Sequence, residues 1–183
     1  MRLKGYHNTE VHNIESILKD GFLCEHNPKH WLGQGIYFFA DADTAIVNID
    51  MLHHKDKITT IIAEIDIEDS AYLDLDLRQN NNAFRNYCKT KAETLKATGQ
   101  ELILKGTDKR QAAQIYKCFF MDLFKQEHGY AVLSKTFAKE NPPYAPKIEN
   151  IEYLGLPFLE KYICVSDNKY IVSKTVLEGE WLV

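Results

Sequence analysis

The sequence lacks the features that mark membrane proteins, disulfide-rich secreted proteins and zinc modules. It has no Cys-x-x-Cys pair, because its four cysteines stand singly, at Cys24, Cys88, Cys118 and Cys164; this disfavours a disulfide framework and a zinc finger. No apolar run reaches the roughly 18 residues that a membrane span needs, and the first residues lack the apolar core of a signal peptide. We therefore expect a cytoplasmic protein with no membrane partner and no metal.

An excess of positive charge is also missing. The chain has 22 Lys and Arg against 26 Asp and Glu, a formal net charge of −4. Non-specific binding of nucleic acid needs clustered basic residues, so such binding is disfavoured and only a local basic face could support it. The 183 residues, 45% of them hydrophobic, suit one globular domain spanning residues 1–183.

Apolar periodicity predicts strands towards both ends of the chain and helices between them, which favours an α+β class over regular βαβ alternation. The expected strands cover 2–7, 35–39, 58–67, 72–75 and 130–133. The expected helices begin after a capping Thr9 and end at Gly21, begin again at Asp41 or Asp43, and cover 81–97 and 107–128. Residues 134–150 are expected to form a loop, and 162–165 and 170–172 a terminal hairpin.

The common phosphate-binding loops are absent too. No Gly-x-Gly-x-x-Gly opens a helix after a strand, so NAD would not bind in a Rossmann crevice. His7 instead ends a predicted strand, Gly33 and Gly35 permit close backbone approach, and Tyr37 could cover a flat heteroaromatic ring. Taken alone, this pattern fits a nucleotide site, but it also fits a structural histidine and a core tyrosine.

Four segments agree in order and spacing: Tyr6–Thr9, Ile14–Phe22, Leu32–Phe38 with its Gly-x-Gly-Ile-Tyr-Phe run, and Ala45. Together they resemble the front half of ADP-ribosyltransferases of the His-Tyr-Glu type, a group that includes poly(ADP-ribose) polymerases, diphtheria-like toxins and small bacterial relatives. The resemblance covers about residues 5–48 strongly and the last 35 weakly. It implies an ADP-ribosyltransferase-like fold, in which split mixed or antiparallel sheets and flanking helices surround an NAD cleft.

The resemblance also implies roles for single residues. His7 would bond the adenosine ribose, Tyr37 would stack on the nicotinamide, and Asn8 and Thr44 would contact the carboxamide. Further NAD contacts would come from Thr9, Gly35 and Phe38. This arrangement requires the rings of His7 and Tyr37 to face each other across one groove.

Three departures from the family pattern stand out. Asn8 replaces the usual glycine after the histidine. A second nicotinamide-stacking aromatic, expected about eleven residues past Tyr37, is missing, because 47–49 reads Val-Asn-Ile. The third departure concerns the catalytic glutamate: one alignment puts Glu160 at this position, a weaker candidate is Glu152, and an alignment on 168–172 puts Lys169 there, which predicts an inactive protein.

The function implied is an NAD-dependent ADP-ribosyltransferase, a pentosyl transferase with Glu160, His7 and Tyr37 as its catalytic set and NAD as co-substrate. It would release nicotinamide and modify a macromolecular acceptor, either protein or nucleic acid. A toxin or defence effector with an antitoxin partner is the role suggested by analogy. Alternatives are an inactive NAD- or ADP-ribose-binding module, an RNA 2′-phosphotransferase-like enzyme, and a scaffold or inhibitor that keeps only the fold.

Overall fold

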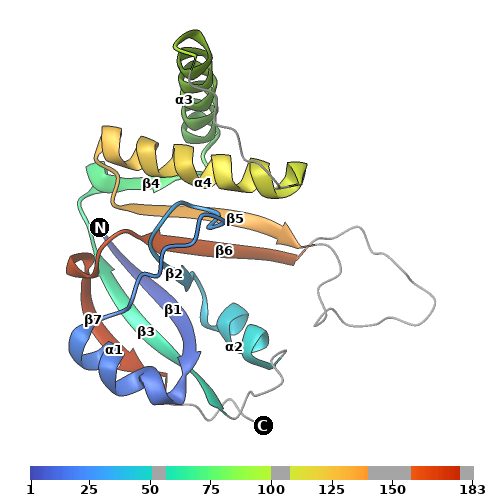
Figure 1. The fold of residues 1–183 in the computed structure, drawn as a ribbon. Coiled ribbons are helices and arrows are strands. Elements are labelled where there is room, and N and C mark those ends of the chain that lie inside the picture. The colour runs from blue at the N-terminus through green and yellow to red at the C-terminus, as the bar shows by residue number, and fades with distance from the viewer. Residues whose placement is uncertain (51–56, 100–107, 140–157, 178–183) are drawn as a thin grey trace.

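The computed structural model describes residues 1–50, 57–99, 108–139 and 158–177. These residues form one mixed seven-stranded sheet with four α-helices around it, in the strand order β4-β5-β6-β2-β1-β3-β7 (Figure 1). The strands are β1 Arg2–Glu10, β2 Ile36–Phe39, β3 Ile58–Asp66, β4 Tyr72–Asp74, β5 Val132–Lys139, β6 Phe158–Val165 and β7 Ile171–Val176. The helices are α1 Ile14–Asp20, α2 Ala42–Asp50, α3 Arg78–Ala97 and α4 Lys109–His128. The predicted α+β class is confirmed.

The sheet consists of two halves that meet at a narrow junction. On one side of it, β1 and β3 pair over nine positions, from Arg2 with Asp66 to Glu10 with Ile58. On the other side, β5, β6 and β2 pair antiparallel, and β4 joins β5 in the one parallel pairing found among the described strands. Across the junction, β1 and β2 share a single registered pair, Tyr6 with Phe39. The halves are therefore joined by far less backbone pairing than each contains.

Side-chain alternation defines two faces of this sheet, which we call the His7 face and the Glu160 face. The His7 face carries His7, Phe38 and Ile163, and its core is closed by Ile17 of α1 and by Phe22. The Glu160 face carries Glu160, Tyr162, Cys164 and Tyr37, in register between β6 and β2. The apolar core of the Glu160 face lies under α4 and includes Leu133, Met121 and Phe124.

Two helices cover different parts of the Glu160 face. Helix α4 lies along β5, and α2 lies beside β1, β2 and β3 (Figure 1). The α2 position is fixed by Asn8, which is on the Glu160 face and donates from Nδ2 to the carbonyl oxygen of Ala45 at 2.8 Å. The segment between α1 and β2 passes over β5 and β6, because Trp31 contacts rings of both strands. A strip of the Glu160 face is therefore bounded by α4 on one side and by α2 on the other.

Most predicted elements are present, with four corrections. Thr9 belongs to β1 and caps no helix, since Val11–Asn13 is a 3-10 turn whose N-cap is Glu10. Helix α3 begins at Arg78, earlier than expected. The strand expected at 130–133 begins at Val132 and continues to Lys139, so the first part of the expected 134–150 loop is strand. The remainder of that loop lies outside the described residues.

The fourth correction concerns the expected terminal hairpin. β6 and β7 do not pair with each other: β6 lies between β5 and β2, and β7 lies at the edge beside β3. Burial explains the difference, because Cys164 and Val165 are fully buried and Val172 is 55% exposed. A strand that is apolar on both faces belongs inside a sheet, whereas a half-exposed strand can stay at an edge. The turn at 166–170 connects these distant positions.

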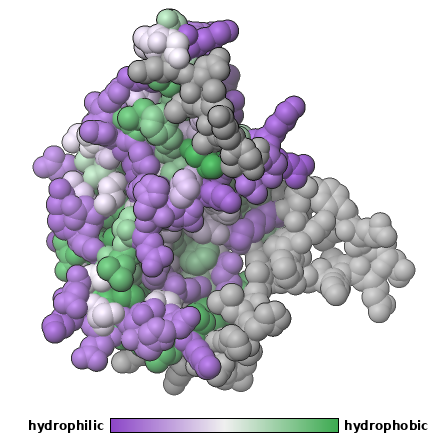
Figure 2. All heavy atoms as spheres, in the orientation of Figure 1, coloured by the Kyte–Doolittle hydropathy of each residue, from purple (hydrophilic) through white to green (hydrophobic). Residues whose placement is uncertain are grey.

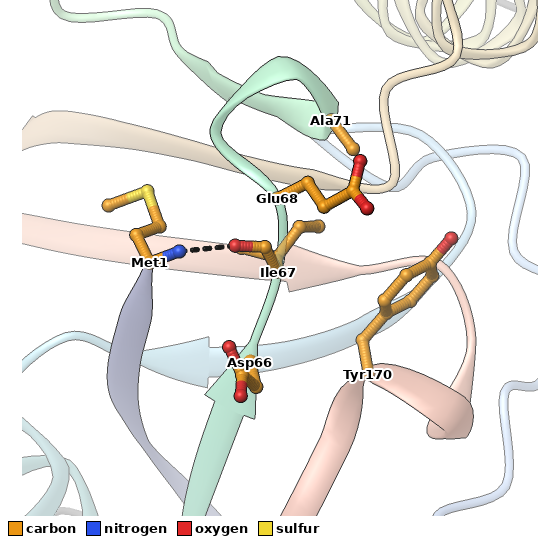
Figure 3. A pocket seen from close by; sticks show the side chains of 6 residues that line it. All are labelled: Met1, Asp66, Ile67, Glu68, Ala71 and Tyr170. Atoms are coloured by element: carbon orange, nitrogen blue, oxygen red, sulfur yellow. Dashed lines mark hydrogen bonds between the residues drawn. The ribbon is translucent and has the colours of Figure 1, made fainter.

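The outer surface is mixed in polarity. Hydrophilic side chains cover most of the outline of the molecule in Figure 2, and apolar side chains show mainly towards the middle of the view. Among the described helices, none is long and apolar enough to cross a bilayer. Figure 3 shows a pocket at the Met1 end of the sheet, lined by Met1, Asp66, Ile67, Glu68, Ala71 and Tyr170. This pocket includes none of the predicted site residues.

Candidate functional site

A buried carboxylate is the most unusual feature of the Glu160 face. Glu160 is only 2% exposed. Its Oε2 accepts a hydrogen bond of 2.5 Å from the hydroxyl of Tyr162 and lies 2.5 Å from Nζ of Lys139, and its Oε1 lies 3.5 Å from Nδ2 of Asn48. These partners come from β6, β5 and α2, so the carboxylate is at a meeting point of three elements. Burying a carboxylate is costly unless it is paired and hydrogen-bonded, as this one is.

Aromatic rings line the strip beside Glu160. The Tyr162 ring lies 5.1 Å from the Phe39 ring, 5.8 Å from the Phe137 ring and 5.7 Å from the Trp31 ring. Trp31 also lies 4.9 Å from Phe137 and remains 40% exposed. The result is an aromatic surface with one buried acid at its edge, a combination suited to flat polar ligands.

The loop that carries Trp31 is fixed by α4. Asp122 accepts from the backbone N–H of Gln34 at 2.7 Å, and Lys125, itself 7% exposed, donates to the carbonyl oxygen of Gln34 at 2.5 Å. A Cβ at Gly33 would lie 2.3 Å from Oδ1 of Asp122, and one at Gly35 would lie 2.5 Å from the Cys164 sulfur. Gly35 is thus required by its packing against the side chain of Cys164 and the backbone of Val165, and Gly33 by its positive φ of 78°. Gly35, expected to contact NAD, is explained by its contact with β6.

Tyr37 lies on the Glu160 face, with its hydroxyl turned into the same loop. This hydroxyl accepts from the N–H of Leu32 at 2.7 Å and donates to the carbonyl oxygen of Gly33 at 2.8 Å. Burial raises the pKa of Tyr37 far above its ordinary value, so the phenol stays protonated. The Tyr37 ring is half-buried and tilted against His30 at 4.8 Å.

His7 is placed at the junction of the two halves of the sheet. Its Nδ1 lies 2.8 Å from the carbonyl oxygen of Tyr37, and its ring contacts Phe22 and Phe38 edge-on. Because a carbonyl can only accept, Nδ1 carries the hydrogen. Burial lowers the pKa of His7 below 6.5, so the ring is neutral at physiological pH and its Nε2 is a hydrogen-bond acceptor.

The expectation that the His7 and Tyr37 rings face each other across one groove is wrong in that form. Adjacent positions on β1 and β2 alternate between the faces, so the His7 side chain belongs to one face and the Tyr37 side chain to the other. The two residues do meet, but by imidazole and backbone carbonyl. The Glu160 face, which carries Tyr37, also carries Glu160 and Tyr162, and Asn48 of α2 reaches Glu160 there.

The remaining predicted NAD contacts have structural partners. The Oδ1 of Asn8 accepts from Thr60, while its Nδ2 bonds α2 as described. The hydroxyl of Thr44 donates to Oδ2 of Asp41 at 2.8 Å, within the turn where Asp41 caps α2. Thr9 accepts from Asn13. Phe38 is 1% exposed in the core of the His7 face, so its ring contacts protein on that face, and its expected NAD contact stays a prediction.

The competing positions for the glutamate are also located. Lys169 lies in the 3-10 turn Asn168–Tyr170, 3.8 Å from Asp167 and 65% exposed. It is in the connection to the edge strand β7, whereas Glu160 is on β6, the strand that pairs with β2 and shares its Glu160 face with Tyr37. Glu152 lies outside the described residues.

Five residues of this site were not predicted from the sequence: Trp31, Phe39, Asn48, Phe137 and Lys139. Beyond residue 133, β5 carries Lys135, Phe137 and Lys139 on one face and small or polar residues on the other, so no apolar alternation marked its extension past 133. Asn48 lies in the segment where the second stacking aromatic was sought, and it reaches Glu160. The sequence analysis therefore pointed to the segment that contains Asn48 but not to its contact with Glu160.

Within the described ranges, no three His, Cys, Asp or Glu side chains lie close enough together to hold a metal ion. The fold and the site define an α+β protein with a buried glutamate in an aromatic strip. Compared with family models, with curated proteins and with solved structures, the chain shows no significant match.

Proposed function

We propose that this chain is an NAD-dependent ADP-ribosyltransferase in which Glu160 is the catalytic carboxylate. The observation that carries the proposal is the setting of Glu160: a buried acid held by Tyr162, Lys139 and Asn48, beside aromatic rings, on the same sheet face as Tyr37. Buried, specifically paired acids cluster at functional sites. The motif resemblance of residues 5–48 supports the choice of NAD as co-substrate.

In this reaction the bond between C1′ of the nicotinamide ribose and the nicotinamide nitrogen breaks, and nicotinamide leaves with the electron pair. Positive charge develops on the ribose, and a carboxylate next to it stabilises that charge. Glu160 would also accept a hydrogen bond from a ribose hydroxyl. The aromatic strip would exclude water and hold the flat nicotinamide. His7, whose ring lies on the other face of the sheet, would act on this site only through its bond to the Tyr37 carbonyl oxygen.

One observation favours a second candidate, an NAD- or ADP-ribose-binding module without catalysis. Lys139 lies 2.5 Å from the Glu160 carboxylate, and a cation there offsets the negative charge that the transition state needs. Lys139 is 29% exposed, so it can turn towards solvent when a ligand enters. The two candidates differ in turnover and not in binding.

The test is to incubate the protein with NAD labelled in its adenosine part and a cell lysate that retains its nucleic acids, and to measure nicotinamide release and label transfer. Glu160→Gln should lower release by at least about a hundredfold. Matched controls are Glu15→Gln, an exposed glutamate on α1, and Lys169→Ala. Nicotinamide release at the wild-type rate by the Glu160→Gln variant would refute the role of Glu160. Thermal stabilisation by NAD without any turnover would support the binding module.

A further inference from the structure

The β5 side of the Glu160 face combines aromatic rings with ammonium groups. On β5, Lys135, Phe137 and Lys139 alternate onto this face, opposite Tyr162, Glu160 and Phe158 of β6. Nζ of Lys135 lies 6.0 Å from the centre of the Phe137 ring, and Nζ of Lys117, from α4, lies 5.7 Å from it. Two cations from different elements therefore converge on one ring next to Trp31.

Charge balance at this place favours an anion. Lys117 is half-buried and makes no ion pair within the described part of the chain. Burial and, after it, the neighbouring Lys135 lower the pKa of Lys117, and both ammonium groups lie within about 6 Å of the same ring. Lys135 lies 3.9 Å from the carboxylate of Asp76, which is shared with Lys161 at 3.4 Å and with Thr136. A phosphate between Lys117 and Lys135 would relieve the repulsion between these two like charges.

Exposure points to a flat ligand group. Trp31 keeps 40% of its surface exposed while its ring lies against Phe137 and Tyr162. Sites that bind single-stranded nucleic acids combine such stacking platforms with basic residues that contact the backbone. The net charge of −4 concerns the whole chain and leaves this local set of lysines unaffected.

We propose that Trp31 and Phe137, with Lys117 and Lys135, bind a base and an adjacent phosphate of a single-stranded nucleic acid, which presents the ADP-ribose acceptor to Glu160. The acceptor role rests on the proposed function; the binding surface does not. NAD would occupy the strip on the β2 and α2 side of Glu160, and the strand would occupy the β5 side. A nucleobase nitrogen or a nucleotide oxygen forms the new bond to C1′ as nicotinamide leaves, and its proton passes to Glu160 or to solvent.

Binding is tested first, without NAD, by fluorescence anisotropy with short labelled single-stranded DNA and RNA of one sequence, with the duplex and a polyglutamate peptide as comparisons. Trp31→Ala should weaken single-strand binding by roughly 5- to 140-fold, the range for losing one stacked base. The control is Phe119→Ala, which removes an equally exposed ring on α4 (40% exposed). It should leave single-strand binding unchanged. Lys117→Gln should flatten the slope of log affinity against log salt by about 0.7, and Lys109→Gln, at the start of α4, serves as its control.

The outcomes separate the surface from the chemistry. Absence of single-strand binding at low salt, equal effects of Trp31→Ala and Phe119→Ala, or preference for polyglutamate would overturn the binding surface, even where nicotinamide release proves the enzyme. Specific single-strand binding without nicotinamide release from NAD would leave the surface standing and refute the proposed function. Label from NAD that resists nucleases and is removed by protease would identify a protein acceptor and overturn the acceptor role.

Discussion

The two faces of the sheet differ sharply where β2 passes between β1 and β6. On the His7 face, Phe38 is 1% exposed and packs edge-on against Phe22, 5.2 Å away, and against His7. On the Glu160 face, the adjacent residue Tyr37 bonds a loop through its hydroxyl, and the neighbouring strand buries an acid. One face is a hydrocarbon core, and the other is a polar network among rings.

The difference shows which face is built for stability. Apolar burial stabilises a fold without special partners, whereas a buried acid needs every partner in place and can be replaced by apolar groups at little cost. The Glu160 cluster is therefore poorly explained by stability alone. The proposed function gives it a chemical reason, and substitutions on the two faces should separate the requirements of stability from those of chemistry.

The largest effect is expected on the His7 face. Phe38→Ala removes a fully buried ring and leaves a cavity beneath Gly5, where Phe38 packs so closely that a Cβ at residue 5 would lie 2.7 Å from Cβ of Phe38. We expect a loss of about 3–5 kcal/mol in the free energy of unfolding, measured by urea denaturation. Phe119→Ala, at an exposed ring, is the control. A loss as small as that of the control would show that this face is not the main core.

A smaller effect is expected one residue away, on the other face. Tyr37→Phe keeps the ring and removes the hydroxyl, which leaves the buried N–H of Leu32 and the carbonyl of Gly33 without this partner. We expect a loss of about 1–2 kcal/mol and, under the proposed function, retained affinity for NAD, because the ring carries the stacking. Urea denaturation and NAD titration by calorimetry measure the two effects. Loss of NAD binding with unchanged stability would show that this hydroxyl contacts NAD and does not stabilise the loop.

Local sequence patterns predicted the individual elements well because each depends on short-range physics. The alternation in Ile58–Asp66 and the periodicity that ends at Gly129 are complete within one element, and the Asp41 cap needs only the next three residues. Strand order is a different kind of property. The run Tyr162–Val165 looks the same whether it pairs with β7 or with β2, and only burial on both faces decides between them.

The candidate site was predicted in part for the same reason. Glu160 was selected by an alignment of residues 159–165 with the family pattern, which put it immediately before a strand expected at 162–165; β6 begins earlier, at Phe158, and contains Glu160. Its partners Lys139 and Asn48 are distant in sequence from Glu160 and carry no local mark, since a lysine or asparagine on a strand or helix surface is ordinary. The sequence also did not show on which face of the sheet the rings of His7 and Tyr37 lie. A prediction that two residues are neighbours does not say whether their side chains or their backbones meet.

The smallest expected effect tests the His7 face by pH. Burial lowers the pKa of His7, so the folded state favours the neutral ring and the unfolded state binds the proton more tightly. The stability that His7 contributes is therefore complete above its unfolded pKa of about 6.5 and declines as the pH falls from there towards the lower folded value. His7→Asn keeps a donor for the Tyr37 carbonyl and cannot be protonated, so its unfolding free energy should fall less steeply from about pH 7 to about pH 5. Urea denaturation across this range measures the slope. His30, whose pKa burial also lowers, is present in both proteins and cancels in the comparison. Parallel slopes for wild type and His7→Asn would mean that the imidazole is in contact with water. The apolar core of the His7 face would then include Phe38 but not His7.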